Sequence, residues 1–520
     1  MFAKKLIPVL VAGLLAGISL NAAAADEKLQ WITVGDAAYK QLQKLAPKAI
    51  AKLSATVDAG SQGIVASEKV HLVQVNEAQM LALSHAVHHE LKRCGGFMFH
   101  PTEAAGRSAL APKTSLVGLA TPSRPSYKID NQATVNAVLP TLQDSNIAQT
   151  IIDLSNFTNR YYQTQGGVNA SNWLLQKWQS MAAGRSDISV SQFTHPSWAQ
   201  KSVILTIQGT DNASEVVILG GHLDSINSAG TSETTRAPGA DDDASGIATM
   251  TEVLRGLVAN GYKPRRTIKM IGYAAEEVGL RGSQEIAANY AANNVNVVGV
   301  MQLDMTNYKG SANDIYLFTD YTDSLQTGFV KNLITTYLPT VKVGSDKCGY
   351  GCSDHASWYN KGYFTTMPFE SAMSASNPKI HTANDTYANS GNQALHALKF
   401  ARMAAAFAIE LGSDGPAAPS TDKTETFTGS LAKGAKKTFG PFKVGGGGTL
   451  KASTTGTGDI DLYAKMGSAP TTSSYGCKSD GSTSTESCTL PTITTNADGY
   501  VLLNGYTAGN YTLTVTYKPQ

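Results

Sequence analysis

The sequence predicts a doubly wound α/β domain, with a mostly parallel sheet and helices on both faces, followed by a small all-β sandwich. Between residues 126 and 413, short apolar runs alternate with segments whose apolar residues recur at helical spacing. From residue 424 to residue 520, the chain is rich in Gly, Ser and Thr and has short alternating runs, which is typical of a sandwich. The length of 520 residues accommodates both domains and an additional N-terminal region.

Residues 1–25 have the features of a secretory signal peptide. Lys4 and Lys5 precede an apolar stretch at 6–20, and the alanines at 23–25 form a small-residue cleavage site. A membrane anchor is the alternative, but the stretch is short and ends in small residues. We therefore expect a secreted, extracellular protein without membrane contact after signal cleavage.

The next stretch, 26–125, has weak periodicity and ends in a turn-rich run at 120–125. Such a run is typical of an exposed boundary and of a cleavage region. We interpret the stretch as a pro-region, which would make the chain a zymogen, and an ordinary N-terminal domain is the alternative. Its histidines His85, His88 and His89 match no zincin spacing, so we expect them to be structural or solvent-facing.

The segment 126–413 contains the elements of the α/β domain in alternation. Periodicity predicts strands at 216–219, 267–273, 297–303 and 315–318, and helices at 244–260, 283–293, 324–338 and 393–411. A linker at 414–423 carries Gly and Pro among small residues. Beyond it, the runs at 500–503 and 511–517 are predicted strands of the sandwich.

Charge and cysteine content narrow the possible partners. A net charge of +2 implies no broad basic surface, which argues against nucleic acid as a main partner, and we expect a monomer. Export would permit disulfides. Two close pairs and one leftover cysteine fit a pairing of Cys348 with Cys352 and of Cys477 with Cys488, with Cys94 free.

The first candidate metal ligand follows the predicted strand 216–219. His222 ends the run Gly-Gly-His, and Asp224 comes two residues later, which in extended chain returns to the same side. A carboxylate there can accept the second imidazole N–H and fix the tautomer that binds a metal. A lone histidine of this kind is more often structural.

Clustered carboxylates follow at two later positions. Asp241, Asp242 and Asp243 begin a predicted helix, where N-terminal capping accounts for one or two of them but not comfortably for three. Glu276 and Glu277 close a predicted strand, where one carboxylate could bind metal while the other moves protons. A lone Glu-Glu pair is usually solvated surface.

Two further candidates complete the set. Asp304 ends an apolar strand, so its ionised form needs a partner, and His381 supplies a second imidazole before an Asp-Thr turn. Each residue is a weak indication alone, but the order His, Asp, Glu-Glu, Asp, His combines two imidazoles with several carboxylates. Nitrogen and oxygen ligands without cysteine suit zinc in a catalytic site. Two nearby ions need a bridging carboxylate, which the Asp triplet can supply.

At these residues the sequence closely resembles the secreted bacterial leucyl aminopeptidases, which are co-catalytic di-zinc exopeptidases. The resemblance covers roughly residues 126–413, and the signal, pro-region and C-terminal sandwich match the family's precursor layout. The sandwich resembles a bacterial pre-peptidase C-terminal domain. The resemblance lies in the runs Gly-Gly-His-Leu-Asp-Ser, Ala-Pro-Gly-Ala-Asp-Asp-Asp-Ala-Ser-Gly, Tyr-Ala-Ala-Glu-Glu-Val-Gly-Leu-Arg-Gly-Ser, Gln-Leu-Asp-Met-Thr-Asn-Tyr, Cys-Gly-Tyr-Gly-Cys-Ser-Asp-His-Ala-Ser-Trp and Met-Pro-Phe-Glu-Ser.

The resemblance implies two zinc ions and a residue set to hold them. The implied ligands are His222, Asp242, Glu277, Asp304 and His381. Asp242 would bridge the ions, with His222 and Asp304 on one and Glu277 and His381 on the other. A cis peptide bond between Asp242 and Asp243 is also implied.

The resemblance also implies the reaction, which is hydrolysis of the N-terminal peptide bond of peptides that have a free N-terminus. A water shared by the two zinc ions would attack the scissile carbonyl. Glu276 would be the general base and then the acid, and Asp224 would orient His222.

A pocket for a large apolar first residue such as Leu is implied as well, although ordinary core packing would use the same residue types. Relatives often carry an aromatic residue at Met373 and another at Ser376, which widens the pocket expected here and leaves the ranking among Leu, Met and Phe open. The Cys348–Cys352 bridge would stiffen the Tyr350 loop. The implied pocket residues are Met305, Phe318, Tyr350, Cys352, Phe369, Met373 and Ile380.

Two other functions are compatible with parts of the sequence. A di-zinc carboxypeptidase or deacylase would need an arginine to bind a substrate carboxylate, and these motifs offer no evident candidate. A non-catalytic peptide-binding or adhesion protein would tolerate loss of Glu276 or of a ligand, yet all of these residues are present. His355, next to the disulfide loop, is expected to lie behind the ligands and not among them.

Overall fold

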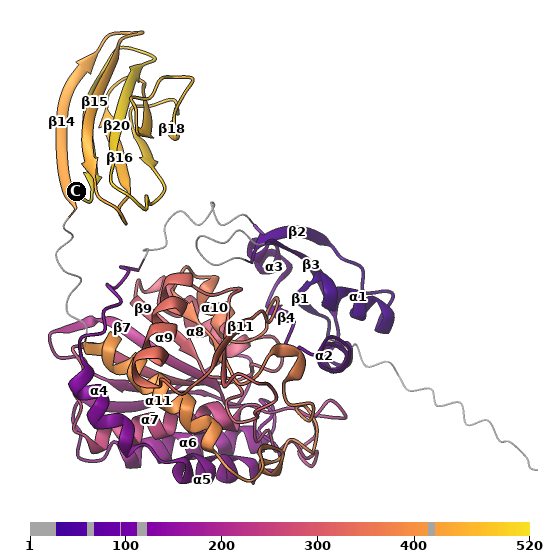
Figure 1. Cartoon of the computed structure of the whole chain (residues 1–520). Helices are drawn as coiled ribbons and strands as arrows, with labels where there is room; N and C mark the ends of the chain where they lie inside the picture. The colour runs from indigo at the N-terminus through magenta and orange to yellow at the C-terminus, as the bar shows by residue number, and fades with distance from the viewer. Residues whose placement is uncertain (1–27, 60–66, 94, 112–121, 414–421) are drawn as a thin grey trace, which may run out of the picture. The chain divides into compact units, whose positions relative to one another are not determined.

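A computed structural model describes residues 28–59, 67–93, 95–111, 122–413 and 422–520 (Figure 1). The described residues form two compact units, one of residues up to Pro122 together with Tyr127–Ser413, and one of Ser123–Ser126 with the C-terminal segment. The expected signal peptide, Cys94 and most of the expected linker lie outside the described residues. Within the described ranges, no helix has the length and apolar character needed to cross a bilayer.

The N-terminal part of the first unit is a four-stranded antiparallel sheet in the order β2-β3-β1-β4, and the stretch interpreted as a pro-region is therefore a folded α/β element. Its apolar core continues into the rest of the unit, since Ile32 and Val34 share a cluster with Ala275 and Val278. Its elements are β1 Gln30–Gly35, α1 Asp36–Leu45, β2 Leu53–Asp58, β3 Ser67–Val75, α2 Glu77–Leu91, β4 Phe97–His100 and α3 Glu103–Ala109.

The central sheet of the first unit is mixed, in the order β12-β9-β7-β8-β6-β5. The strands β12, β9, β7 and β8 are parallel, whereas β6 is antiparallel to β8 and β5 is antiparallel to β6. The expected parallel arrangement therefore holds for the four strands at one edge of the sheet and not for β5 and β6 at the other edge. The other side differs because β5 and β6 are joined without a crossover helix. The strands are β5 Ile188–Phe193, β6 Ser202–Ile207, β7 Asn212–His222, β8 Arg266–Tyr273, β9 Asn296–Gln302 and β12 Thr365–Thr366.

Helices cover both faces of this sheet. Alternate residues of β7 face opposite sides, so Val217 and Leu219 join the largest apolar cluster while Ile218 joins another. The largest cluster also contains side chains of α4 Gln132–Val138, α5 Asp144–Ser155, α6 Gln165–Met181, α7 Ala244–Ala259, α9 Ser324–Tyr337 and α11 Leu395–Ser413. The opposite face packs against α8 Arg281–Ala292 and α10 His355–Tyr359. The expected strand at 315–318 lies outside this sheet, in a three-stranded sheet of β10 Ile315–Phe318, β11 Val343–Asp346 and β13 Pro368–Phe369.

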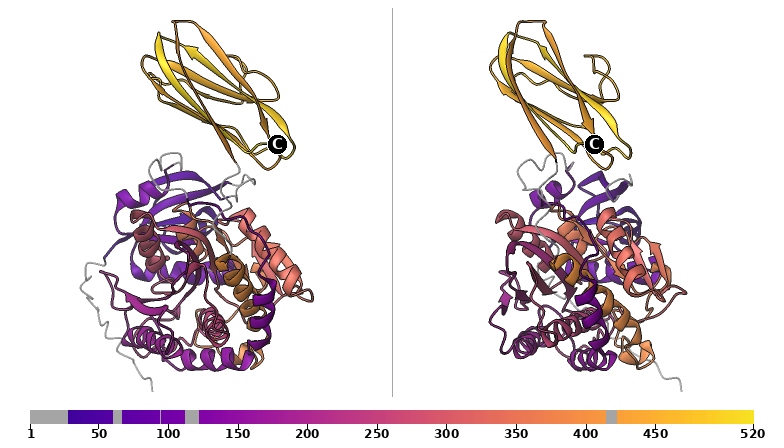
Figure 2. Two further views of the ribbon diagram at one scale, coloured as in Figure 1. Left: turned by 90° about the vertical axis from the view of Figure 1, so that its left-hand side faces the viewer. Right: turned by 60° about the vertical axis from the view of Figure 1, so that its left-hand side comes forward.

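The second unit is a β-sandwich whose two layers are visible in Figure 2. One sheet has the order β14-β21-β16-β19 and the other β15-β20-β17-β18, and apolar side chains such as Leu462, Val501 and Leu513 fill the space between them. The Cys477–Cys488 disulfide joins the two sheets. The strands are β14 Lys423–Leu431, β15 Lys436–Val444, β16 Leu450–Gly456, β17 Ile460–Met466, β18 Cys477–Ser479, β19 Glu486–Thr489, β20 Ala497–Gly505 and β21 Gly509–Tyr517.

Candidate metal centre

The predicted ligands meet at the carboxyl edge of the parallel strands, where ligands gather in open α/β sheets. Strand β7 ends at His222, and β9 ends at Gln302, two residues before Asp304. Asp242 and Asp243 come directly before α7, and the peptide bond between them is cis. Residues far apart in the sequence therefore converge because parallel strands all end at one edge of the sheet.

Asp242 lies at the centre of the cluster, between the two imidazoles. Its Oδ1 is 2.8 Å from His222 Nε2, and its Oδ2 is 3.1 Å from His381 Nε2. His222 Nε2 is also 3.6 Å from Asp304 Oδ1, and His381 Nε2 is 2.9 Å from Glu277 Oε2. The five side chains form two half-sites that share one carboxylate.

These separations fit a zinc centre. Ligand atoms at about 2.1 Å from one tetrahedral ion are roughly 3.4 Å apart. The distances in the His222 half-site, 2.8 and 3.6 Å, lie on either side of this value, and those in the His381 half-site, 3.1 and 2.9 Å, are slightly shorter. Oxygen Oε1 of Glu277 is buried and accepts no hydrogen bond in the described part of the chain, so it remains available to a cation. The donor set of two imidazoles and three carboxylates therefore suits zinc in number, type and spacing.

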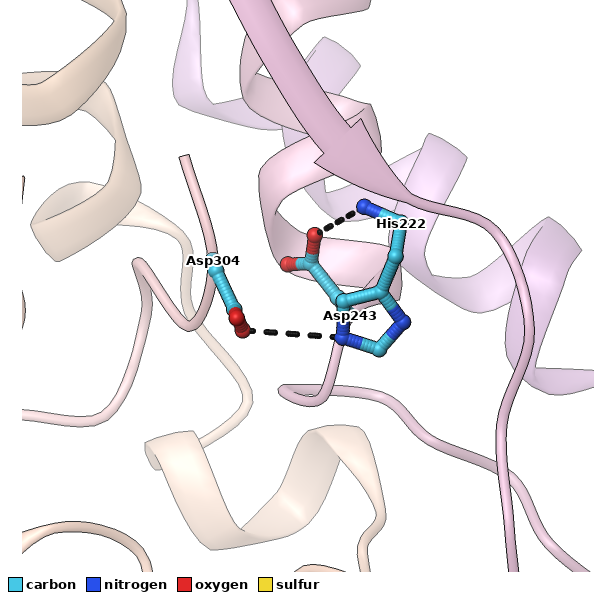
Figure 3. Close-up of side chains that lie close together, drawn as sticks. All are labelled: His222, Asp243 and Asp304. Carbon is cyan, nitrogen blue, oxygen red and sulfur yellow. Dashed lines mark hydrogen bonds and ion pairs between the residues drawn. The ribbon is translucent and has the colours of Figure 1, made fainter. Parts of the chain in front are cut away.

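Asp243 also lies near His222 and Asp304, but its carboxylate has another role. It accepts the backbone N–H of His222 at 2.9 Å, of Gly246 at 2.8 Å and of Met305 at 3.2 Å. Figure 3 shows Asp304 pointing toward the His222 imidazole, whereas the Asp243 carboxylate points toward the His222 backbone nitrogen. Asp243 therefore caps α7 and holds two ligand-bearing segments together, and Asp242 is the better ligand.

Asp224 lies between His222 and the backbone of the Glu276–Glu277 pair. Its carboxylate accepts the backbone N–H of Glu276 at 3.0 Å and of Glu277 at 3.1 Å. It also lies 3.5 Å from His222 Nδ1, which is an electrostatic contact longer than a good hydrogen bond. The sequence indicated the contact with His222, but it gave no sign of the bonds to the Glu-Glu pair.

The pKa values of the carboxyl groups in the centre are shifted because many of these groups are buried close together. Burial and neighbouring carboxylates raise the pKa of Glu276 well above its usual value and that of Glu277 to about 7. Burial alone would also raise the pKa of Asp242, but hydrogen bonds from His222 and His381 hold it well below its usual range. A cation is what would keep such a group of carboxylates ionised at neutral pH.

Behind the ligands lies a polar network that the sequence did not indicate. Asp385 accepts the backbone N–H groups of Asp241 and, at 3.1 Å, of Asp242. Asn377 donates to both Asp241 and Asp385, at 3.0 and 3.1 Å. The first Asp of the triplet is thus part of the support and not of the ligand set. A single buried Asp in a polar loop carries no pattern that could have identified it.

An apolar cluster adjoins the centre, because Met305 follows Asp304 and Ile380 precedes His381 in the chain. Tyr350 instead packs in a separate cluster, and its hydroxyl lies 2.7 Å from Thr33 Oγ1 of the N-terminal sheet. The Cys348–Cys352 disulfide closes the loop that carries Tyr350. The apolar cluster contains Met305, Phe318, Cys352, Phe369, Met373 and Ile380 of the predicted pocket, together with Cys348 and Met367.

Helix α2 of the N-terminal part lies against His381. Ser84 Oγ is 3.4 Å from His381 Nδ1, and the rings of His88 and His381 are 5.5 Å apart. His85 is exposed and its ring contacts that of His89, as expected for solvent-facing residues, whereas His88 is buried and faces the predicted ligand His381. His355 is fully buried, and burial lowers its pKa to about 3.

Buried imidazole and carboxylate groups at the carboxyl edge of a mixed α/β sheet are typical of a metal-dependent enzyme. Residues 202–407 match the model of "Peptidase family M28". The chain is 41% identical to leucine aminopeptidase 1 of Penicillium rubens over 287 residues, covering 52% of this chain and 72% of that protein. It is 34% identical to leucine aminopeptidase 1 of Coccidioides posadasii over 354 residues, covering 65% of this chain and 88% of that protein.

Comparison with solved structures also finds similar proteins over most of the chain. LapB from Legionella pneumophila matches with a TM-score of 0.60 and 29% identity, covering 74% of this chain and 100% of that one. The LapA aminopeptidase of the same organism matches with a TM-score of 0.60 and 29% identity, covering 75% and 100%. The chain belongs to peptidase family M28. It is a metallo-aminopeptidase, and the prediction of a hydrolase of this type is confirmed.

Proposed function

We propose that this chain is a secreted di-zinc aminopeptidase that removes Leu and other large apolar residues from the free N-termini of peptides. The observation that carries this proposal is the position of Asp242, whose two oxygens face two different imidazoles. One ion would be held by His222, Asp304 and Asp242. The other would be held by Glu277, His381 and Asp242.

The residues around the ions divide the chemical work. Bound zinc ions supply Lewis-acid activation of water and of the scissile carbonyl. Glu276 takes the proton from the attacking water and returns it to the leaving amine. Its position suits this task, because it is 6% exposed and its backbone N–H is anchored to Asp224. Asp224 in turn stands beside His222 and orients that ligand.

The surroundings of the centre support the substrate preference. The free, neutral α-amine of a substrate would bind a zinc ion at the centre, which is why the substrate would need an unblocked N-terminus. The apolar cluster begins at Met305 and Ile380, each adjacent in the chain to a ligand, so the first side chain of a substrate would meet apolar surface beside the reacting bond. Phe318 and Phe369, stacked at 4.9 Å between ring centroids, suit a large apolar residue.

The N-terminal element supports a precursor function. Helix α2 brings Ser84 and His88 against the ligand His381, where a substrate must approach. Tyr350, predicted for the substrate pocket, bonds instead with Thr33 of the N-terminal sheet. We infer that residues 26–125 form a pro-region that limits access until it is removed.

Metal content and substrate choice test the proposal directly. The protein should contain two zinc ions per chain and hydrolyse Leu-anilide, but not an N-blocked analogue or a substrate offered at its carboxyl terminus. Glu276→Ala should lower kcat by at least about a hundredfold while zinc content stays unchanged. Glu285→Ala, on the neighbouring helix α8, is the control and should retain activity. Hydrolysis of the N-blocked substrate, or normal turnover by Glu276→Ala, would contradict the assignment.

A further inference from the structure

Arg160 is a fully buried arginine that the proposed reaction does not use. It lies between α5 and α6, and its guanidinium donates hydrogen bonds only to backbone carbonyls among its described partners. Nε donates to Leu223 O at 2.8 Å, and Nη2 donates to Gly239 O at 2.9 Å. Nη1 donates to Pro238 O and, at 3.3 Å, to Leu154 O. One side chain therefore joins three separate segments.

Two of these segments carry groups of the metal centre. Leu223 lies between His222 and Asp224, and Gly239 lies three residues before Asp242. A second link runs in parallel, since the Arg160 backbone N–H donates to Ser225 Oγ at 3.1 Å. The Ser225 hydroxyl then donates to Ala237 O at 2.8 Å. The strand end that carries His222 is thus tied to the loop that leads into Asp242.

Gly239 shows how closely the loop is built around this guanidinium. A Cβ atom on residue 239 would lie 2.8 Å from Arg160 Nη2 and 2.4 Å from Asp242 O. The residue also has a φ of +51°, which side chains rarely adopt. Glycine is required on both grounds, and its small size brings Arg160 against the segment of the bridging ligand.

The guanidinium of Arg160 is buried, yet its described hydrogen bonds go to backbone carbonyls and not to a carboxylate. Arg266, equally buried, forms an ion pair with Glu215, whereas the contacts of Arg160 are carbonyl dipoles. Burial lowers the pKa of Arg160 to about 10, opposed by nearby aspartates that include Asp224 and Asp242, so it stays protonated at neutral pH. A buried cation beside an anionic centre lowers the mutual repulsion of carboxylates when no metal is bound.

We propose that Arg160 is a positioning residue for the metal centre. It clamps the His222 strand end to the Asp242 loop, so that imidazole and carboxylate are held at ligand spacing before an ion arrives. This inference rests on the proposed zinc centre. The inference goes beyond the proposed centre because it assigns part of the zinc affinity to a residue that would contact no ion.

The test compares Arg160→Lys with the matched control Arg266→Lys in the full chain. Lysine keeps the charge but has its donors at one point, so it cannot reach carbonyls in three segments. Arg266 begins β8 and lies roughly 23 Å along that strand from its metal-site end. Zinc affinity is measured by chelator competition, and the absorption spectrum of the Co²⁺ form reports ligand geometry.

Arg160→Lys should bind zinc at least about tenfold more weakly and alter the Co²⁺ spectrum, while Arg266→Lys keeps wild-type values. Equal affinity in the wild type and both variants would overturn the inference, as would an equal loss in both variants. If Arg160→Lys does not fold, Ser225→Ala decides: weaker zinc binding in a folded protein supports the clamp, and unchanged binding overturns it. Wild-type protein that binds no zinc would instead refute the proposed function.

Discussion

Replacing Asp224 by Asn tests whether the metal centre depends on a residue that binds no metal. The Asp224 carboxylate accepts two consecutive backbone N–H groups, from Glu276 at 3.0 Å and Glu277 at 3.1 Å, and lies 3.5 Å from His222 Nδ1. The substitution keeps the shape of the side chain. It replaces one acceptor oxygen with an NH₂ group that cannot accept a hydrogen bond.

The size of the effect follows from these contacts. Whichever way the amide is oriented, Glu276 N–H or Glu277 N–H must face a donor inside the protein. An unpaired buried N–H costs about 1 to 3 kcal/mol, and about 1.4 kcal/mol corresponds to a tenfold change in affinity. Because the disturbed peptide groups carry the proposed base and one proposed ligand, Asp224→Asn should weaken zinc binding by roughly 10- to 100-fold, which is also the usual range for partners of metal ligands.

Chelator competition measures this change, and Asp320→Asn provides a matched control. Asp320 is a buried carboxylate that also accepts two consecutive backbone N–H groups, from Cys348 at 3.1 Å and Gly349 at 2.7 Å. Both variants should lose thermal stability, but only Asp224→Asn should lose zinc affinity. Wild-type zinc affinity in Asp224→Asn, or an equal loss in Asp320→Asn, would refute the reasoning.

Two further predictions concern the precursor and pH. The full chain should hydrolyse Leu-anilide more slowly than protein that has been cleaved within 112–126 and separated from residues 28–111, because helix α2 contacts His381. Equal rates would argue against inhibition by the N-terminal region. Burial would raise the pKa of Asp314, but Lys309 and Lys399 hold it below its usual range. That contribution to stability is present above the unfolded pKa of about 3.8 and is lost as pH falls. Asp314→Asn should therefore cost about 1 to 2 kcal/mol in urea unfolding at pH 7 and less at pH 3; an equal cost at both would contradict this sign.

The sequence could predict the convergence of the ligands because they sit beside strong local patterns. Apolar runs predicted β7 and β9, and His222 and Asp304 follow those runs almost directly. Ligands at the ends of parallel strands must share one edge of the sheet, so linear order translated into spatial proximity. His381 has no predicted strand before it, so the residue pattern indicated it only as a second imidazole, and its pairing with Glu277 was implied by the resemblance to a family.

Other features depend on contacts that no local pattern records. The antiparallel β5 and β6 follow from a connection without a helix, which periodicity alone does not show. The N-terminal sheet has weak periodicity because part of its core is supplied by residues such as Ala275 and Val278, more than a hundred positions away. Arg160 lies in the segment between α5 and α6, and its burial becomes evident only when the loop around Gly239 is folded.

The excess of acidic residues at the centre has a structural explanation. Asp224, Asp243 and Asp385 are not among the proposed ligands, yet each fixes the backbone beside one or two of them by accepting backbone N–H groups. Each bond limits where the backbone can lie, so the positions of the proposed ligands are determined by the protein as well as by the ion. The anchored groups are the N–H of Glu276 and Glu277, of His222 and Met305, and of Asp241 and Asp242. Asp242 and Asp243 are adjacent residues of the same type, and the structure distinguishes their roles because Asp242 faces two imidazoles whereas Asp243 accepts three backbone N–H groups.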